Sequence, residues 1–149
     1  MGFVFSLERV LQLRRQRERQ QMLRLAEARR RERDTENRLQ ALNHRREGIE
    51  IELRRFQQTS PRPDMLLAYS RHLAALGERI DATERELVSR RQEVAKERQI
   101  LSSLAKDRKV LERLRERRLS EYQQEQLYQE QKELDEIAGK MYWQQEGGG

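Results

Sequence analysis

The chain has 149 residues, of which 39% are charged and 35% hydrophobic, and its formal net charge is +6. This apolar fraction is too small for a large globular core, but it suffices for a narrow seam between helices. Abundant Ala, Glu, Lys, Leu and Arg with helical periodicity are typical of a coiled coil. The absence of cysteine excludes disulfides and cysteine-based metal sites. No apolar run is long enough to span a bilayer, and the first residues do not read as a signal peptide, so we expect a cytoplasmic protein.

The first helix is expected from about residue 7 to about residue 58, after a short apolar leader. Ser6 is expected to cap it, because a short side-chain oxygen accepts hydrogen bonds from the first free N–H groups. Residues at alternating steps of four and three form one stripe, as in a coiled-coil seam. The stripe comprises Leu7, Leu11, Arg14, Glu18, Gln21, Leu25, Ala28, Glu32, Thr35, Leu39, Leu42, Arg46, Ile49, Leu53 and Phe56.

A break at residues 59–64 contains both prolines of the chain, Pro61 and Pro63. Proline lacks a backbone donor, clashes with the preceding helical turn and keeps the residue before it out of the helical region. Ser60 or Asp64 is expected to cap the next helix, and either proline fits its first turn. Because this connection is short, the two helices are expected to pair antiparallel.

The second helix is expected from about residue 65 to about residue 142. Its seam comprises Leu66, Tyr69, Leu73, Leu76, Ile80, Thr83, Leu87, Arg90, Val94, Glu97, Leu101, Leu104, Arg108 and Leu111. Beyond Leu111 the register slips, since Leu114, Leu119 and Tyr122 do not continue it, and such a stutter changes the supercoil locally.

These patterns predict an all-α fold, a long two-helix antiparallel coiled-coil hairpin with a Pro-containing tip and a C-terminal overhang of the second helix. We expect one domain over residues 1–149, with a disordered tail at 144–149. Both seams are most apolar beside the tip, where Phe56 and Leu53 would face Leu66 and Tyr69. The tightest packing is therefore expected there, with looser and more polar pairing further away.

The overhang follows from the unequal helix lengths. Leu7 should lie near residues 114–118, so the second helix continues alone from about Leu119. From Tyr122 onward the chain has two lysines and six acidic residues, which leaves 30 basic and 20 acidic residues before it. Leu127, Leu134 and Met141 recur every seven residues in this acidic segment. An amphipathic stripe without an intramolecular partner indicates an intermolecular one. Extension of the first helix or dimerisation would also cover it.

No catalytic constellation is visible. His44 and His72 lie on opposite helices without a carboxylate partner at helical spacing, and no glycine-rich phosphate loop occurs. We therefore expect no enzyme, no cofactor and no metal. Arginine clusters at residues 14–17, 29–31 and 115–118 would suit nucleic acid, but acidic residues are interspersed and no aromatic platform accompanies them. They fit solvated helix faces better, so no nucleic-acid partner is expected.

Two stretches nevertheless resemble the flagellar export protein family FliJ. The N-terminal one is Phe3-x-Phe5-x-Leu7-x-x-Val10-Leu11-x-Leu13-Arg14. The distal one is Leu111-x-x-Leu114-x-x-x-Arg118-x-x-x-Tyr122, followed by Gln131-Lys132-Glu133-Leu134-Asp135-Glu136-Ile137-Ala138. Length and two-arm plan also match, so the resemblance covers nearly the whole chain.

The resemblance implies a component of the flagellar type III export apparatus, similar to the central stalk of rotary ATPases. It implies that the paired ends insert into the hexameric export ATPase FliI and promote its assembly and activity. The implied ATPase-facing residues are Phe3, Phe5, Leu7, Leu11, Arg14, Arg118, Tyr122, Leu134 and Ile137. A surface near Leu42 and Leu76 is implied to contact the export gate protein FlhA, and export chaperones are further implied partners. The membrane would be reached only through these partners, at its cytoplasmic face.

Three alternatives stay open at the level of sequence. The chain could be the equivalent stalk of a virulence injectisome, a basic coiled-coil adaptor that binds nucleic acid, or a structural spacer that self-associates through its overhang. The terminal motifs favour the flagellar interpretation over the injectisome one.

Overall fold

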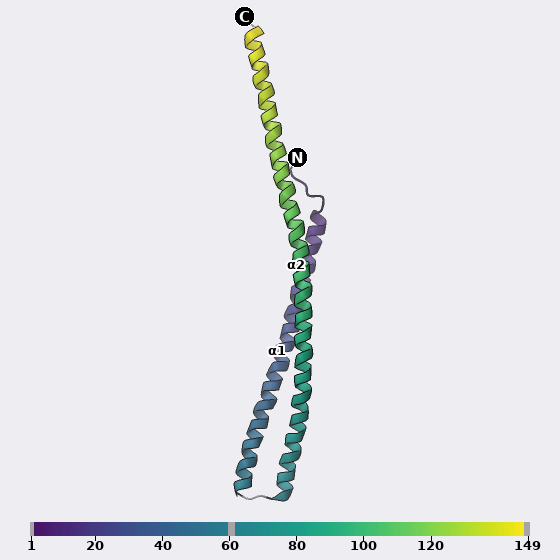
Figure 1. The fold of residues 1–149 in the computed structure, drawn as a ribbon, viewed down its shortest axis with the longest axis vertical. Helices are drawn as coiled ribbons and strands as arrows, with labels where there is room; N and C mark the ends of the chain where they lie inside the picture. The colour runs from purple at the N-terminus through teal and green to yellow at the C-terminus, as the bar shows by residue number, and fades with distance from the viewer. Residues whose placement is uncertain (1, 60–61, 148–149) are drawn as a thin grey trace. The chain divides into compact units, whose positions relative to one another are not determined.

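The protein is an all-α coiled-coil hairpin of two long helices (Figure 1). The computed structural model describes residues 2–59 and 62–147. Helix α1 spans Glu8–Thr59 and helix α2 spans Pro63–Gly147, close to the expected 7–58 and 65–142 at three of the four ends. The aromatic rings of Phe56 and Tyr69 lie 5.8 Å apart, which places the two helices antiparallel beside the tip, as their seams predict.

The first helix is not capped by Ser6, contrary to the expectation. The amide of Leu11 donates to the carbonyl of Leu7 at 2.9 Å, so the first α-helical bond begins at Leu7. The amide of Glu8 donates to the carbonyl of Phe5 at 3.1 Å and closes the preceding turn. Ser6 instead accepts a hydrogen bond from Arg118 at 2.9 Å. Its hydroxyl is therefore used to join the two helices rather than to satisfy helix-end donors.

The second helix begins earlier than expected, at Pro63. The carbonyl of Arg62 accepts its first α-helical hydrogen bond at 3.0 Å, which makes Pro63 the first helical residue. Proline suits that position because its missing N–H would be unpaired anyway. Asp64 is thus not the cap. It lies within the first turn, where its negative charge interacts favourably with the positive end of the helix dipole. The other expected tip residues, Ser60 and Pro61, lie outside the described residues.

The second helix also ends later than expected, at Gly147 rather than near Tyr142. Residues 144–147, expected to belong to a disordered tail, are helical, and residues 148–149 lie outside the described part of the chain. Once a helix has formed, each further residue adds one backbone bond, so it continues through Gln and Glu residues that carry no stop signal.

Contacts divide the chain into two compact units, which are described separately. The terminal unit comprises Met1–Arg17 and Leu104–Gly149, and the central unit comprises Glu18–Ser103. The central unit therefore holds the turn and most of the seam, whereas the terminal unit holds both chain ends and the overhang.

In the central unit, every residue of the two expected seam stripes is buried or half-buried. On α1 the distribution of burial is the reverse of the expectation, whereas on α2 four of the five fully buried residues, Leu76, Ile80, Thr83 and Leu87, fall in the stretch that was expected to pack tightly. Fully buried residues of α1 in this unit lie between Glu18 and Thr35, whereas seam residues from Leu39 to Phe56 are only half-buried. The fully buried residues include both small side chains, such as Ala28, Thr35 and Thr83, and large ones, such as Leu76 and Ile80, so side-chain size alone does not decide burial.

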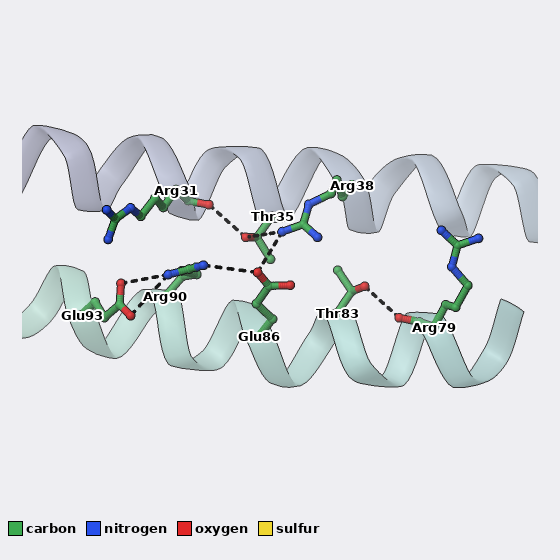
Figure 2. Close-up of polar contacts among 8 residues, drawn as sticks. All are labelled: Arg31, Thr35, Arg38, Arg79, Thr83, Glu86, Arg90 and Glu93. Atoms are coloured by element: carbon green, nitrogen blue, oxygen red, sulfur yellow. Dashed lines mark hydrogen bonds and ion pairs between the residues drawn. The ribbon is translucent and has the colours of Figure 1, made fainter.

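A polar network crosses the central unit beside Thr35 (Figure 2). Arg38 Nη2 donates to Thr35 Oγ1 at 3.2 Å and to Glu86 Oε1 at 2.9 Å. Arg90 contacts the same Glu86 at 3.4 Å and Glu93 at 3.4 Å, and its buried Nε has no hydrogen-bond partner. These hydrogen bonds lower the pKa of Glu86, with the one from Arg38 as the largest cause. Such charged cross-links fix the helix register more than they add stability.

In the terminal unit, Leu11 is completely buried and Phe5 nearly so. The half-buried residues of α2 include Leu111, Arg115, Leu119 and Tyr122, at steps of four, four and three. Arg115 and Tyr122 continue the seven-residue register of Leu111, so the expected slip beyond Leu111 is seen at Leu114 and Leu119, each one position off this register, but not at Tyr122. Tyr122 itself remains in the seam, contrary to the expectation that it leaves the register.

Candidate functional site

The N-terminal leader folds onto α2 through aromatic and cationic contacts. The rings of Phe3 and Tyr122 are 5.7 Å apart and tilted by 52°. The guanidinium of Arg115 lies 5.9 Å from the centre of the Phe3 ring, and that of Arg118 lies 5.6 Å from the Phe5 ring. Cations at this range are attracted to the faces of aromatic rings. The leader is thereby held against α2. Residues 2–17 and residues 104–122 together form the paired end of the terminal unit, which extends as far as Tyr122.

Ion pairs reinforce this paired end on its surface. Arg115 Nε lies 3.0 Å from Glu8 Oε2, and Arg14 lies 3.2 Å from Asp107. Arg15 lies 3.3 Å from Glu112, whose pKa is lowered chiefly by a hydrogen bond from Arg108 and also by Arg15. Because these pairs are partly exposed, each contributes at most about 1 kcal/mol to stability. Their main effect is to specify which residues of the two helices face each other.

The expected ATPase-facing residues fall into two groups. Seven belong to the paired end, where Phe5 and Leu11 are buried, Phe3, Leu7, Arg14 and Tyr122 are half-buried, and Arg118 is exposed. The other two, Leu134 and Ile137, lie on the overhang and are more than half exposed. Phe5 and Leu11 thus hold the two helices together, whereas a partner can reach Arg118, Leu134 and Ile137 directly.

The overhang is the part of α2 beyond Tyr122, and all of its described residues, 123–147, are exposed (Figure 1). Its large apolar side chains are Leu127, Tyr128, Leu134, Ile137, Met141, Tyr142 and Trp143. Single exposed apolar residues are ordinary on protein surfaces, but a heptad-spaced row on one helix marks an interaction site. Within the described part of the chain, no helix covers this row.

Of the apolar residues on the overhang, only Leu134 and Ile137 were expected from the sequence to face the ATPase. Met141, 61% exposed, continues the apolar row of Leu134 and Ile137 toward the end of α2, whereas Trp143, 74% exposed and nine residues after Leu134, lies on the opposite side of the helix. The seven-residue repeat already contained the signal for Met141. Arg115 was placed in an arginine cluster, and its contact with the aromatic leader becomes visible only when the leader is folded onto α2.

The residues expected to face the export gate lie in the central unit. Leu76 is 2% exposed and belongs to the buried seam, whereas Leu42 is half-buried and lines a groove between α1 and α2. Direct contact with a partner is therefore open to Leu42 but not to Leu76 in this arrangement.

His44 and His72 line one shallow depression, together with Tyr69 and Glu52. In the described ranges, no group of three or more His, Cys, Asp or Glu residues has the arrangement that a metal ion requires. A search of the described helices for a segment able to cross a membrane also found none.

Comparison with known protein families identifies the chain. A family model described as "Flagellar FliJ protein" matches residues 3–147. The chain belongs to the FliJ family. Membership of the FliJ family makes it a component of the flagellar export apparatus. Searches of curated proteins and of solved structures gave no match.

Proposed function

We propose that this FliJ-family protein is a non-enzymatic, stalk-like coiled coil that binds the FliI export ATPase hexamer and activates it. In this proposal the paired end and the overhang enter the ring, while the central unit contacts the export gate FlhA through the surface at Leu42. It further escorts export chaperones and reaches the cytoplasmic face of the membrane through these partners.

The exposed apolar row of the overhang is the observation that carries the proposal. Leu134 and Ile137 are 61% and 54% exposed on a helix that bears acidic flanks. Burial of such side chains against a partner removes apolar surface from water, at about 25 cal/mol per Å². The helix is already formed, so binding does not incur the cost of folding it.

The test measures steady-state ATP hydrolysis by the cognate export ATPase with and without this protein, together with mass photometry of the mixture. We expect stimulation and a hexamer-sized complex. The variant Leu134→Asp/Ile137→Asp should weaken binding by roughly 30-fold or more, which corresponds to about 2 kcal/mol for central apolar anchors.

The matched control is Leu67→Asp/Val88→Asp, which places two aspartates at exposed apolar positions of the central unit. It should bind and stimulate the ATPase as the unchanged protein does. Helicity by circular dichroism should be nearly the same in all variants, because none of the four side chains is buried. Absence of both stimulation and complex formation with the unchanged protein would refute the proposal.

A further inference from the structure

A groove between the two helices of the central unit combines an apolar floor with a cationic rim. It encloses about 420 Å³ and is lined by Arg38, Ala41, Leu42, Arg45, Arg79, Ala82 and Thr83. Both helices contribute, and no carboxylate lines it. Three other grooves of this unit each include at least one carboxylate, contributed by Glu27, Glu93 and Glu97, by Glu32, or by Glu52.

Two cations of the rim are free to bind a ligand. Arg38 is engaged with Glu86 at 2.9 Å, but the side chains of Arg45 and Arg79 form no ion pair or hydrogen bond within the described chain. Figure 2 shows the guanidinium of Arg79 extended toward α1, while its backbone carbonyl accepts from Thr83. On α1, residues 37–46 contain three arginines and no acidic residue. The groove therefore presents positive charge from both sides.

We propose that this groove docks an acidic segment of a partner protein that inserts an apolar side chain between the two helices. Arginine presents a planar fork of donors that matches a carboxylate bidentately, so Arg45 and Arg79 can each hold one acidic side chain. The floor of Ala41, Leu42 and Ala82 supplies the apolar contact. Charge selects the partner, and the apolar anchor supplies affinity.

With respect to the export gate, the inference rests on the proposed contact at Leu42, to which it adds the chemistry of recognition. It does not depend on ATPase binding, because the groove lies wholly in the central unit. The segment of the gate that binds here would be acidic, and it would carry a large apolar residue among its carboxylates.

The test uses fluorescence anisotropy with the full-length protein and a labelled synthetic peptide as probe. The probe is an amphipathic peptide of about 15 residues with leucines on one face and glutamates at the flanking positions. Two companion peptides replace either the leucines by serine or the glutamates by glutamine. The protein variants are Arg45→Glu/Arg79→Glu and the control Arg54→Glu/Arg55→Glu, which changes the net charge equally on exposed positions outside the groove.

We expect the groove variant to bind the probe roughly tenfold more weakly, equivalent to about 1.4 kcal/mol, and the control variant to bind normally. Both companion peptides should bind more weakly than the probe. Equal losses in the two variants would show attraction to the general positive field and overturn the inference, as would absence of binding at about 1 mM probe. Arg45→Gln/Arg79→Gln, which adds no repulsion, should lie between the groove variant and the unchanged protein.

A parallel pull-down with the cytoplasmic part of the gate separates the two proposals. If the gate binds the groove variant as well as the unchanged protein, the gate contact stands and the groove inference fails. If the probe binds in the groove but the gate does not bind at all, the groove stands and the gate part of the proposed function fails.

Discussion

Leu11 is completely buried near the start of α1, two residues before the exposed Leu13. Replacing Leu11 by alanine removes apolar surface and leaves a cavity, and such changes cost about 2–5 kcal/mol. We expect a loss near the lower limit, because a two-helix seam can relax around the gap. Urea unfolding followed by circular dichroism measures it, with Leu13→Ala as a matched control that should stay within about 0.5 kcal/mol. Equal effects of the two changes would mean that the paired end is not held by its seam.

Glu86 links stability to pH, because Arg38 and Arg90 hold its pKa below the ordinary value of 4.5. A carboxylate with a lowered pKa in the folded state contributes stability that is fully present above its unfolded pKa. That contribution is lost as the pH falls through the folded pKa. The melting temperature should therefore decrease as the pH drops below about 4.5, and Glu112 acts in the same direction. The variant Glu86→Gln/Glu112→Gln should melt lower than the unchanged protein at pH 7 and show a flatter acid limb. If the melting temperature of the variant fell with pH as steeply as that of the unchanged protein, carboxylates other than Glu86 and Glu112 would cause the acid destabilisation.

At the scale of the helices, Gly48 weakens α1 without an evident compensating contact. A Cβ atom placed on it would meet no atom within 4 Å, and the residue lies well inside the helix. Gly48→Ala should therefore stabilise the protein by about 0.5–1 kcal/mol, since alanine loses less backbone entropy on helix formation. Thermal unfolding provides the measurement. Gly2→Ala, at an equally open position before α1, is the control and should not change the melting temperature. Destabilisation by Gly48→Ala would reveal a close approach at this site that the structure does not contain.

The helices and their seams could be predicted from the sequence because a heptad pattern states directly which side chains share a face. The pattern contains no information on how closely the two faces approach. A stripe of large residues such as Leu53 and Phe56 therefore suggested tight packing, although these residues are only half-buried and the fully buried residues of α1 in the central unit lie further from the tip. The caps were mispredicted for a related reason: the hydroxyl of Ser6 had a better partner in Arg118, which is distant in sequence. Exposure of the overhang was predictable from the lengths of the two helices alone.

At the scale of the whole molecule, the charge is unevenly distributed along the sequence. From Tyr122 onward six acidic residues stand against two lysines, whereas the preceding residues hold an excess of basic ones. A protein with two oppositely charged regions can be steered electrostatically toward a partner and oriented on it. Charges at the rim of an interface mainly change the association rate and its dependence on salt.

The proposed binding to the ATPase ring should consequently weaken with ionic strength, because the Debye length falls from ~10 Å at 0.1 M salt to ~3 Å at 1 M. Association and dissociation rates measured over this range should show the effect mainly in association. The variant Glu133→Gln/Asp135→Asn/Glu136→Gln, which neutralises three acids beside the apolar row, should have a smaller salt slope and still form the complex. The apolar anchors Leu134 and Ile137 remain in that variant, so its dissociation rate should change little. A salt-independent affinity of the unchanged protein would leave the apolar row as the basis of binding and remove the role assigned here to the acidic residues.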